Sequence, residues 1–540
     1  MQRARTVVIG VVLPLILSTV TSCASSNEAA SSAKQTTSAS SPSASSQAAT
    51  TTATTTTDTT TTATTTSSSS TTTTPASTTL PRPPGPAADV SEELTAGAGV
   101  FLGSAVGAGL GGTGYVEHEF VAAGTATSYR ADGPLSTDGR WTFSAATDAK
   151  ADYRTRVVVR RPEHASDFSG TVVVEWLNVS GGIDADPDYA TLREDIIRNG
   201  DAWVGVSAQL LGISGGPVLV SASGASAVAG KGLRSIDPVR YGSLLHPGDG
   251  YSFDIFTQVA RAVREGGSAL GDLHPDVVIA AGDSQSAFAL TTYIDGVQPM
   301  THAFDGFFVH SRGSVALPLV GPGEFADLAR GLGTGTALFR DDTDVPIIEL
   351  QAESDVTGIL NSFAARQPDT ERFRLWEVAG TAHADVHLVG PFSASMNCGV
   401  QINNGPLHIV AKAAYRGLVN WIRTGVAPPT APLLEVSTEG PPTVQRDADG
   451  IALGGIRTPP VDVPIDVLSG NPGPTPSLIC LLLGSTTPLP ADRLAELYPT
   501  VADYTTAYAA SVEAAIAAGY ALADDRDALA AFAEPSRIAG

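Results

Sequence analysis

Ser284 stands in a pattern that could make a serine an acylating nucleophile. Residues 276–281 (DVVIAA) form a short apolar run typical of a buried strand, 282–286 (GDSQS) can make a tight turn, and 287–293 are compatible with a helix. A strand-turn-helix elbow of this kind lifts a serine hydroxyl to the top of a sheet, and small residues two positions on either side allow the turn. Ser286 replaces the usual second glycine. The alternative is that Ser284 only caps the helix.

The base and the acid that such a serine needs are both available downstream, each just past an expected strand. The strand 345–350 leads into 351–355 (QAESD), and the strand 373–378 leads into 379–383 (AGTAH). In hydrolases of the α/β type, loops after later strands supply these groups in the order serine, acid, histidine. The sequence therefore predicts a relay for acyl transfer.

Within these loops, His383 and Asp355 are the expected base and acid. His383 directly follows its strand and a glycine turn, whereas His387 comes further along the chain. Asp355 lies deeper in its loop than Glu353, which remains the alternative acid. His310 ends another expected strand, and we expect it to pack or to support the site rather than to react.

Acyl transfer also needs N–H donors for the oxyanion of the tetrahedral intermediate. One is expected from the backbone of Gln285, directly after the serine, and the other from the loop 178–182 (NVSGG) that follows the strand 171–177. Within that loop we choose Val179. Asn178 also begins a formal glycosylation sequon, but its place beside the expected site makes that interpretation the weaker one.

Two literal motifs lack the structural context that they need. Residues 212–216 (GISGG) match the nucleophile pattern GxSxG, but Pro217 and a Val/Ser/Ala-rich loop follow where a helix should begin. Residues 109–114 (GLGGTG) match the dinucleotide pattern GxGxxG, but a strand is expected after them instead of a helix. We expect a loop serine and a glycine-rich turn.

The elements that must position these residues alternate between strands and helices. Short apolar or β-branched runs separated by helical stretches predict an α/β fold, a mostly parallel twisted sheet with helices on both faces, whose active site lies beyond the carboxyl ends of the strands. The expected strands are 115–120, 154–159, 171–177, 202–206, 277–281, 304–310, 345–350 and 373–378, and the expected helices are 253–264, one after Ser284, and 407–423.

Composition limits the partners of the chain. The 540 residues are 42% apolar and carry a net charge of −23, so a large core is available and an acidic surface disfavours nucleic acid. An uncharged or weakly charged small molecule or lipid ester suits this surface better. Three cysteines without a CxxC spacing give no zinc site, and no metal or organic cofactor is implied.

The start of the chain resembles an export signal. Arg3 and Arg5 precede the apolar stretch 7–20, which is short for a permanent membrane span. The order Val-Thr-Ser-Cys ending at Cys23 is that of a bacterial lipobox, so we expect removal of residues 1–22 and a lipid anchor on Cys23 at the outer face of the cell membrane. The alternative is an ordinary signal peptide with an incidental cysteine.

Composition also divides the rest of the chain. Residues 23–86 carry the anchor and a Ser/Thr-rich segment with too little apolar surface to fold, which predicts a tether. We expect one hydrolase core over 87–427, with a short lid over 314–344, and an extension of the same domain over 428–540 whose main element is a helix over 501–521.

Several longer segments support a family resemblance. The chain resembles the bacterial α/β-hydrolase domain-containing proteins, a family of exported serine esterases, from about residue 115 to about residue 508. The resemblance implies an α/β-hydrolase fold and places Ser284, Asp355 and His383 on the triad, although the family commonly has Glu where Asp283 stands. The matching segments are VVVEWLNVSGG (172–182), GDSQSAFALTTYI (282–294), FDGFFVHSRG (304–313), QPDTERFRLWEVAGTAHAD (367–385) and GIALGGIRTPPVDVP (450–464).

Cys398 and Cys480 are the cysteines that remain after Cys23. An oxidising location outside the cell favours a disulfide between them, which would pin the extension to the core. The alternative is two buried free thiols.

These features favour a membrane-tethered serine hydrolase of carboxylic esters. Amidase, thioesterase or acyltransferase chemistry stays open, because a triad alone does not select the leaving group or the acceptor. From another class, the lipobox and tether are equally typical of a non-catalytic envelope lipoprotein that uses this fold to bind a ligand or partner.

Overall fold

A nine-stranded sheet organises the part of the chain that the computed structural model describes, residues 82–100, 102–103, 109–221, 227–331 and 335–539. Its order is β1-β2-β3-β5-β4-β6-β7-β8-β9, with antiparallel pairing from β1 to β5 and parallel pairing from β5 to β9. The strands are β1 (Asp89–Glu93), β2 (Tyr115–Ala131), β3 (Phe143–Pro162), β4 (Thr171–Trp176), β5 (Ala202–Val206), β6 (Val277–Asp283), β7 (Gly306–His310), β8 (Ile347–Ala352) and β9 (Phe373–Val378).

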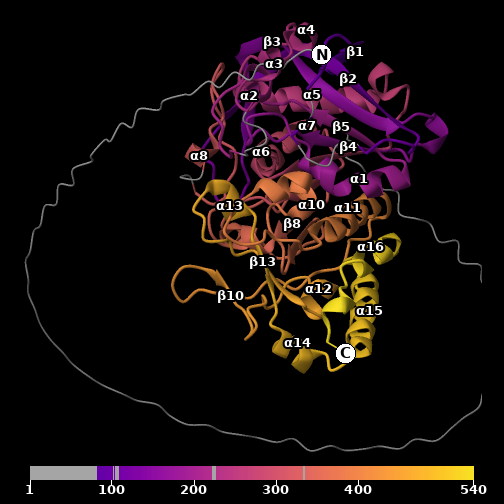
Figure 1. Cartoon of the computed structure of the whole chain (residues 1–540). Helices are drawn as coiled ribbons and strands as arrows, with labels where there is room; N and C mark the ends of the chain where they lie inside the picture. The colour runs from indigo at the N-terminus through magenta and orange to yellow at the C-terminus, as the bar shows by residue number, and fades with distance from the viewer. Residues whose placement is uncertain (1–81, 101, 104–108, 222–226, 332–334, 540) are drawn as a thin grey trace, which may run out of the picture. The chain divides into compact units, whose positions relative to one another are not determined.

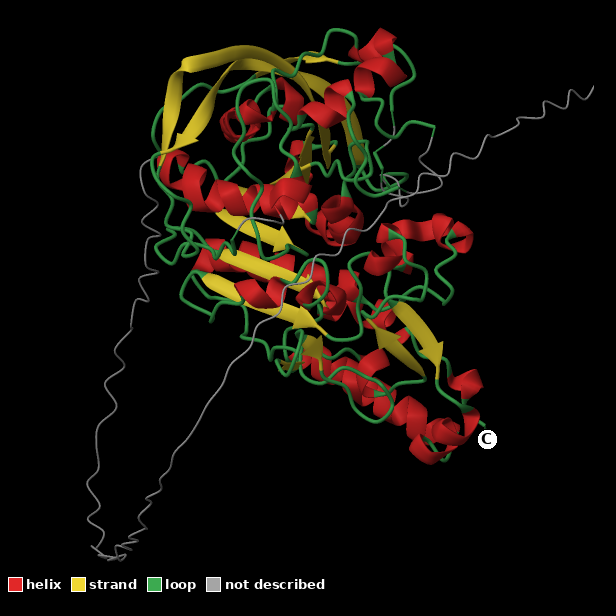
Figure 2. Ribbon diagram, turned by 90° about the vertical axis from the view of Figure 1, so that its left-hand side faces the viewer, coloured by secondary structure: helices red, strands yellow, loops and turns green. Residues whose placement is uncertain are grey.

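Helices cover both faces of this sheet (Figure 2). Alternate residues of β4 point to opposite faces: Val172 and Val174 join a core cluster with α5 (Ser252–Glu265) and α6 (Gln285–Thr292). Val173 joins a second cluster with α1 (Pro187–Asn199) and α11 (Leu407–Thr424). Every residue of β4 is buried, as expected of a strand covered on both sides. The predicted mostly parallel α/β sheet is confirmed.

The antiparallel hairpin β2–β3 is longer than the sequence predicted. Its strands have 17 and 20 residues and pair from Tyr115 with Pro162 to Ala131 with Phe143. Only the segments 115–120 and 154–159, about a third of each strand, were expected as strands. The outer halves are half-exposed and carry many polar residues, so backbone pairing extends them where the apolar pattern stops.

The extension holds more regular structure than the one helix expected over 501–521. Figure 1 shows α12, α14 and α15 together at one end of the molecule, and α15 ends at Ala517, two residues before Gly519, which has a φ of +81°. The helices and strands of the extension are β10 (Val436–Ser437), β11 (Thr443–Val444), α12 (Pro459–Asp462), β12 (Asp466–Ser469), α13 (Leu478–Leu482), β13 (Ser485–Pro488), α14 (Ala491–Leu497), α15 (Val501–Ala517) and α16 (Arg526–Ala530).

The extension packs on the hydrolase core. Ile409 of α11 shares an apolar cluster with Tyr504, Tyr508 and Val512 of α15. The ring of Trp376 in β9 meets that of Tyr520 edge-on, with centroids 5.3 Å apart. The part of the chain before the extension also contains short helices: α2 (Leu210–Ser214), α3 (Leu233–Ile236), α4 (Pro238–Tyr241), α7 (Gln298–Thr301), α8 (Leu328–Gly331), α9 (Glu353–Val356) and α10 (Val386–Val389).

Cys398 and Cys480, which are 82 positions apart in the chain, form a disulfide with their Cα atoms 5.4 Å apart. Cys480 lies in α13 of the extension, whereas Cys398 precedes α11, and both are buried. The disulfide therefore joins the extension to the core, as the sequence predicted.

Removing this disulfide should lower the free energy of unfolding by about 4.5 kcal/mol, because the unfolded chain regains the entropy of a long open loop. Urea denaturation of the oxidised chain and of a Cys398→Ala, Cys480→Ala variant measures the difference. Either single alanine variant should lose as much as the double variant, and an unchanged free energy of unfolding would contradict the expectation.

The predicted leader, Cys23 and most of the tether lie outside the described residues. The last residues of the tether, from Arg82 to Pro86, are described and contact the fold. Arg82 pairs with Asp305, and the carbonyl of Pro86 accepts a hydrogen bond from Arg261. Over the described ranges, the structure has no helix with the length and apolarity needed to span a bilayer.

Candidate active site

The structure brings Ser284, His383 and Asp355 together in one chain of contacts. The Oγ of Ser284 lies 2.9 Å from Nε2 of His383, and Nδ1 of the same ring lies 2.8 Å from Oδ1 of Asp355. Ser284 is half-buried, whereas His383 and Asp355 are buried. These are the distances and the order of contacts that a serine hydrolase relay needs.

Ser284 occupies a sharp turn between β6 and α6. Its backbone has a φ of 57° and a ψ of −119°, a conformation that costs energy for any residue but glycine. The backbone N–H of Ser284 donates to the carbonyl of His310 at the end of β7, which fixes the turn against the sheet. A Cβ at Gly282 would lie 3.0 Å from the backbone of Ser286, a tight contact, so a glycine gives the turn room at this position.

Two donors orient the carboxylate of Asp355. The hydroxyl of Ser311 and the backbone N–H of Ala352 both donate to its Oδ2, at 2.7 and 2.8 Å, which leaves Oδ1 to face His383. Ser311 directly follows β7 and has a φ of 53°. Sequence reasoning missed this serine, since its only sequence signal is its place at the end of a strand.

Glu353, the alternative acid, points elsewhere. Its carboxylate accepts hydrogen bonds from the backbone N–H groups of Gly380 and Gly470, at 2.7 and 2.8 Å, and pairs with the guanidinium of Arg446. Gly470 and Arg446 belong to the extension. Glu353 therefore ties the loop after β8 to the extension, and of the two acids only Asp355 contacts the ring of His383.

His387, the alternative base, lies against another histidine. Its ring stacks on His408 of α11, with centroids 3.8 Å apart and planes 2° from parallel, and its Nε2 lies 3.3 Å from the carbonyl of Ala190. His387 therefore packs where α10 meets α11 and α1.

His310 lies buried next to the turn at Ser284, as the prediction of a supporting role allows. Its Nδ1 is 3.1 Å from the carboxylate of Asp188 and 3.6 Å from that of Asp283, the residue before Ser284. Burial opposes a charge on His310, but Asp283 and Asp188 outweigh it and raise its pKa to about 9. Burial raises the pKa of Asp283 to about 6, against the attraction of His310.

The two residues chosen for the oxyanion lie together. The backbone N–H of Val179 donates to the side-chain Oε1 of Gln285 at 3.4 Å, a long hydrogen bond. The Nε2 of Gln285 donates to Gln209 at 2.6 Å, and the same Gln209 oxygen accepts from the indole of Trp176 at 3.1 Å. Gln209, which the sequence did not single out, therefore holds the Gln285 side chain beside the loop after β4.

The side chain of Asn178 makes hydrogen bonds within and next to this loop. Its amide donates to the carbonyl of Asp283 at 3.0 Å, and its Oδ1 accepts from the backbone and the hydroxyl of Ser180. These bonds link the loop after β4 to the turn at Ser284. Asn178 is only 6% exposed, so in the folded chain its amide is not accessible to a glycosyl group.

A cavity of about 560 Å³ opens beside these groups. Val179 and Gln285 line it, together with residues 324–328 of the expected lid. Leu219 and Phe325 contribute apolar side chains that are 40% and 39% exposed. This cavity has the size and lining of a small-molecule site.

Neither literal motif acquires its functional context. Ser214 is the last residue of α2, so a helix precedes this serine instead of following it. The glycine-rich segment 109–114 runs directly into β2, and no helix follows it. Within the described parts of the chain, no three His, Cys, Asp or Glu side chains lie close enough to hold a metal ion.

Comparison with known proteins assigns this architecture to a family. The sequence model of a family described as an alpha/beta hydrolase domain matches residues 83–531, most of the chain. The chain belongs to this alpha/beta hydrolase domain family. The predicted α/β-hydrolase fold is thus confirmed, while the bacterial, exported and lipid-anchored character of the chain stays a prediction.

Solved structures of other hydrolases match parts of this alpha/beta hydrolase. An esterase of Rhizomucor miehei is 12% identical over 57% of this chain and 85% of its own, with a TM-score of 0.28. A Xanthomonas campestris serine hydrolase without a lid is 13% identical over 47% and 83%, with a TM-score of 0.23. Carboxyl esterase 2 of Tuber melanosporum is 11% identical over 55% and 88%, with a TM-score of 0.24. A search of curated proteins returns no match.

Proposed function

We propose that this alpha/beta hydrolase cleaves carboxylic esters through an acyl-enzyme on Ser284. The observation that carries the proposal is the unbroken chain of contacts from Ser284 through His383 to Asp355, with the serine held on a strained turn. A buried histidine between a serine hydroxyl and an oriented carboxylate is the arrangement that activates a serine for acyl transfer.

In the proposed reaction, Oγ of Ser284 attacks the acyl carbonyl and its proton passes to Nε2 of His383. The carbonyl oxygen becomes an oxyanion, which the backbone N–H groups of Gln285 and Val179 bind. The substrate oxygen then replaces the Gln285 side chain on the N–H of Val179, a bond that is already long. His383 returns the proton to the departing alkoxide, then deprotonates the water that releases the acid and restores Ser284.

Activity should rise with pH through the ionisation of His383, because only the neutral ring accepts the serine proton. Burial opposes a charge on this ring, but the carboxylate of Asp355 outweighs burial and raises the pKa of His383 above its usual value. The acid limb of kcat/KM should therefore have its midpoint above about 6.5. A profile that falls as pH rises from 5 to 8, or a midpoint below that value, would contradict this role.

We also propose that the enzyme works at the outer face of a bacterial membrane, held by a lipid on Cys23 and by the Ser/Thr-rich tether. The sequence features of residues 1–86 support this proposal. Metabolic labelling with a fatty-acid analogue should label the wild type and not a Cys23→Ala variant. Equal labelling of both would exclude an anchor at this cysteine.

The proposed activity is tested with purified protein lacking the leader. Aryl esters of short and long acyl chains should be hydrolysed, and a fluorophosphonate probe should label one site. Aryl amides and thioesters in the same assay measure the preference for the leaving group. If the protein hydrolyses no ester and the probe does not label it, the result would favour the non-catalytic alternative, in which the fold only binds a ligand or partner.

A further inference from the structure

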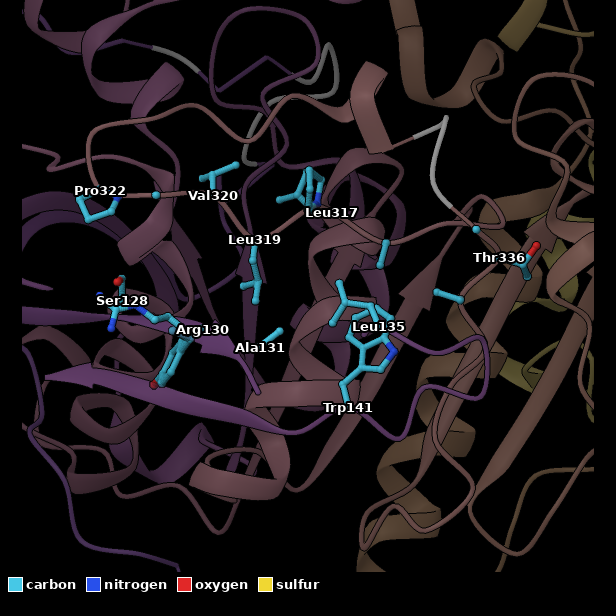
Figure 3. A pocket seen from close by; sticks show the side chains of 16 residues that line it. Ser128, Arg130, Ala131, Leu135, Trp141, Leu317, Leu319, Val320, Pro322 and Thr336 are labelled. Carbon is cyan, nitrogen blue, oxygen red and sulfur yellow. The ribbon is translucent and has the colours of Figure 1, made fainter. Parts of the chain in front are cut away.

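A second cavity, of about 490 Å³, has a lining distinct from that of the cavity beside Gln285 (Figure 3). One wall is the end of the β2–β3 hairpin, from Ser128 to Trp141, and the other is formed by residues 316–322 and 335–337. None of Ser284, His383 and Asp355 lines it. Its volume is in the range of small-molecule sites in proteins.

The middle of this cavity is apolar. Figure 3 shows the side chain of Leu319 pointing toward Ala131, with Leu135 and Trp141 side by side. The indole N–H of Trp141 donates to the carbonyl of Ser136 at 2.7 Å, so its polar atom is used within the hairpin. Leu135 is 46% exposed, so a ligand that covers it gains the free energy of burying apolar surface.

Hydrogen bonds hold both walls in place. Leu317 donates its N–H to the carbonyl of Phe288 at 2.9 Å, and its carbonyl accepts from the hydroxyl of Thr292, so this wall is fixed to α6. The backbone N–H of Leu338, directly after residues 335–337 of the same wall, donates to the carbonyl of Thr137 at 2.8 Å and joins this wall to the hairpin loop. A preformed cavity binds without the cost of ordering its walls.

One end of the cavity carries an arginine that is paired with a surface carboxylate. Ser128 and Arg130 lie at this end, away from Thr336 (Figure 3). Arg130 pairs with Asp148 at 2.9 Å, but the two side chains are 59% and 69% exposed. An ion pair this exposed contributes little free energy, so a ligand anion can take the place of Asp148.

We propose that this cavity binds a free alkanoate, a linear carboxylate whose chain lies between Leu135, Trp141 and Leu319 and whose head group pairs with Arg130. An apolar cavity with a cation at one end is complementary to this class of molecule in shape and in charge. The site goes beyond the proposed esterase function, because binding there involves neither Ser284 nor any bond breaking.

Calorimetric titration of the mature chain with hexanoate, octanoate and decanoate, below their micelle-forming concentrations, tests the proposal. Each added CH₂ should tighten binding about four-fold, the effect of burying one methylene. The Leu135→Gln variant should weaken decanoate binding about ten-fold. The Arg130→Gln variant should weaken the binding of every acid by a similar factor of about ten. Decanol, titrated in parallel, should bind the wild type more weakly than decanoate does, and this preference should disappear in the variant.

Matched variants separate this site from the cavity beside Gln285. Leu219→Gln changes a leucine of similar exposure in that other cavity, and Arg526→Gln changes an exposed arginine that pairs with Glu513 in the extension. Both should leave decanoate binding unchanged. The proposal is overturned if Leu219→Gln weakens binding and Leu135→Gln does not, if affinity is independent of chain length, or if no binding is measured. Because ester turnover is not the readout, a failed esterase assignment would leave this result interpretable.

Discussion

Replacing Ser284 by alanine should lower kcat for ester hydrolysis by about 10⁶-fold, the loss that follows removal of the nucleophile from a serine triad. Without Oγ, His383 has no hydroxyl to deprotonate and no acyl-enzyme forms. The oxyanion donors at Val179 and Gln285 remain, so a small residual rate over water is expected. Stopped assays with an activated aryl ester measure the rate, and loss of fluorophosphonate labelling measures the nucleophile directly.

Ser214→Ala is the matched control, because Ser214 carries the literal GxSxG match and is exposed at the end of α2. It should retain both turnover and labelling. Labelling that persists in Ser284→Ala and disappears in Ser214→Ala would show that the nucleophile is misassigned. Circular dichroism and thermal melting of both variants establish that neither result comes from unfolding.

The sheet could be predicted from the sequence where burial controls the residue pattern. The strands β5 and β9 have their predicted bounds, and β4 and β6 differ by one or two residues. Every residue of these four strands except Arg374 is buried, although β9 lies at the edge of the sheet. The outer half of the β2–β3 hairpin was missed because its half-exposed strands carry no such run. The four- and five-residue helices of the extension were missed because packing, and not local propensity, stabilises elements that short.

The spacing of residues in the sequence was enough to predict only part of the candidate site. Strand ends and glycines mark the places of Ser284 and His383, because the elbow and the turn after β9 need small residues at fixed positions. The choice between Asp355 and Glu353 could not be made locally, since both follow β8 within three residues. The structure separates them through distant partners: Ser311 orients Asp355, while Arg446 and Gly470 hold Glu353.

Replacing Asp355 by asparagine should lower kcat by about 10⁴-fold while the fold is kept. The amide no longer holds Nδ1–H of His383 toward itself, so the ring can adopt the tautomer that cannot accept the serine proton. It also removes the charge that raises the pKa of His383, so burial would then lower that pKa. The acid limb of the remaining activity should therefore move to lower pH than in the wild type.

Glu353→Gln is the discriminating control for this assignment. Its carboxylate pairs with Arg446 and accepts from Gly380 and Gly470, so the amide should cost about 1–3 kcal/mol of stability while kcat stays within a few-fold of the wild type. Urea denaturation measures the first effect and ester turnover the second. If Glu353→Gln instead lost about 10⁴-fold in kcat and Asp355→Asn only stability, the loop after β8 would supply its other carboxylate to His383 in the working enzyme.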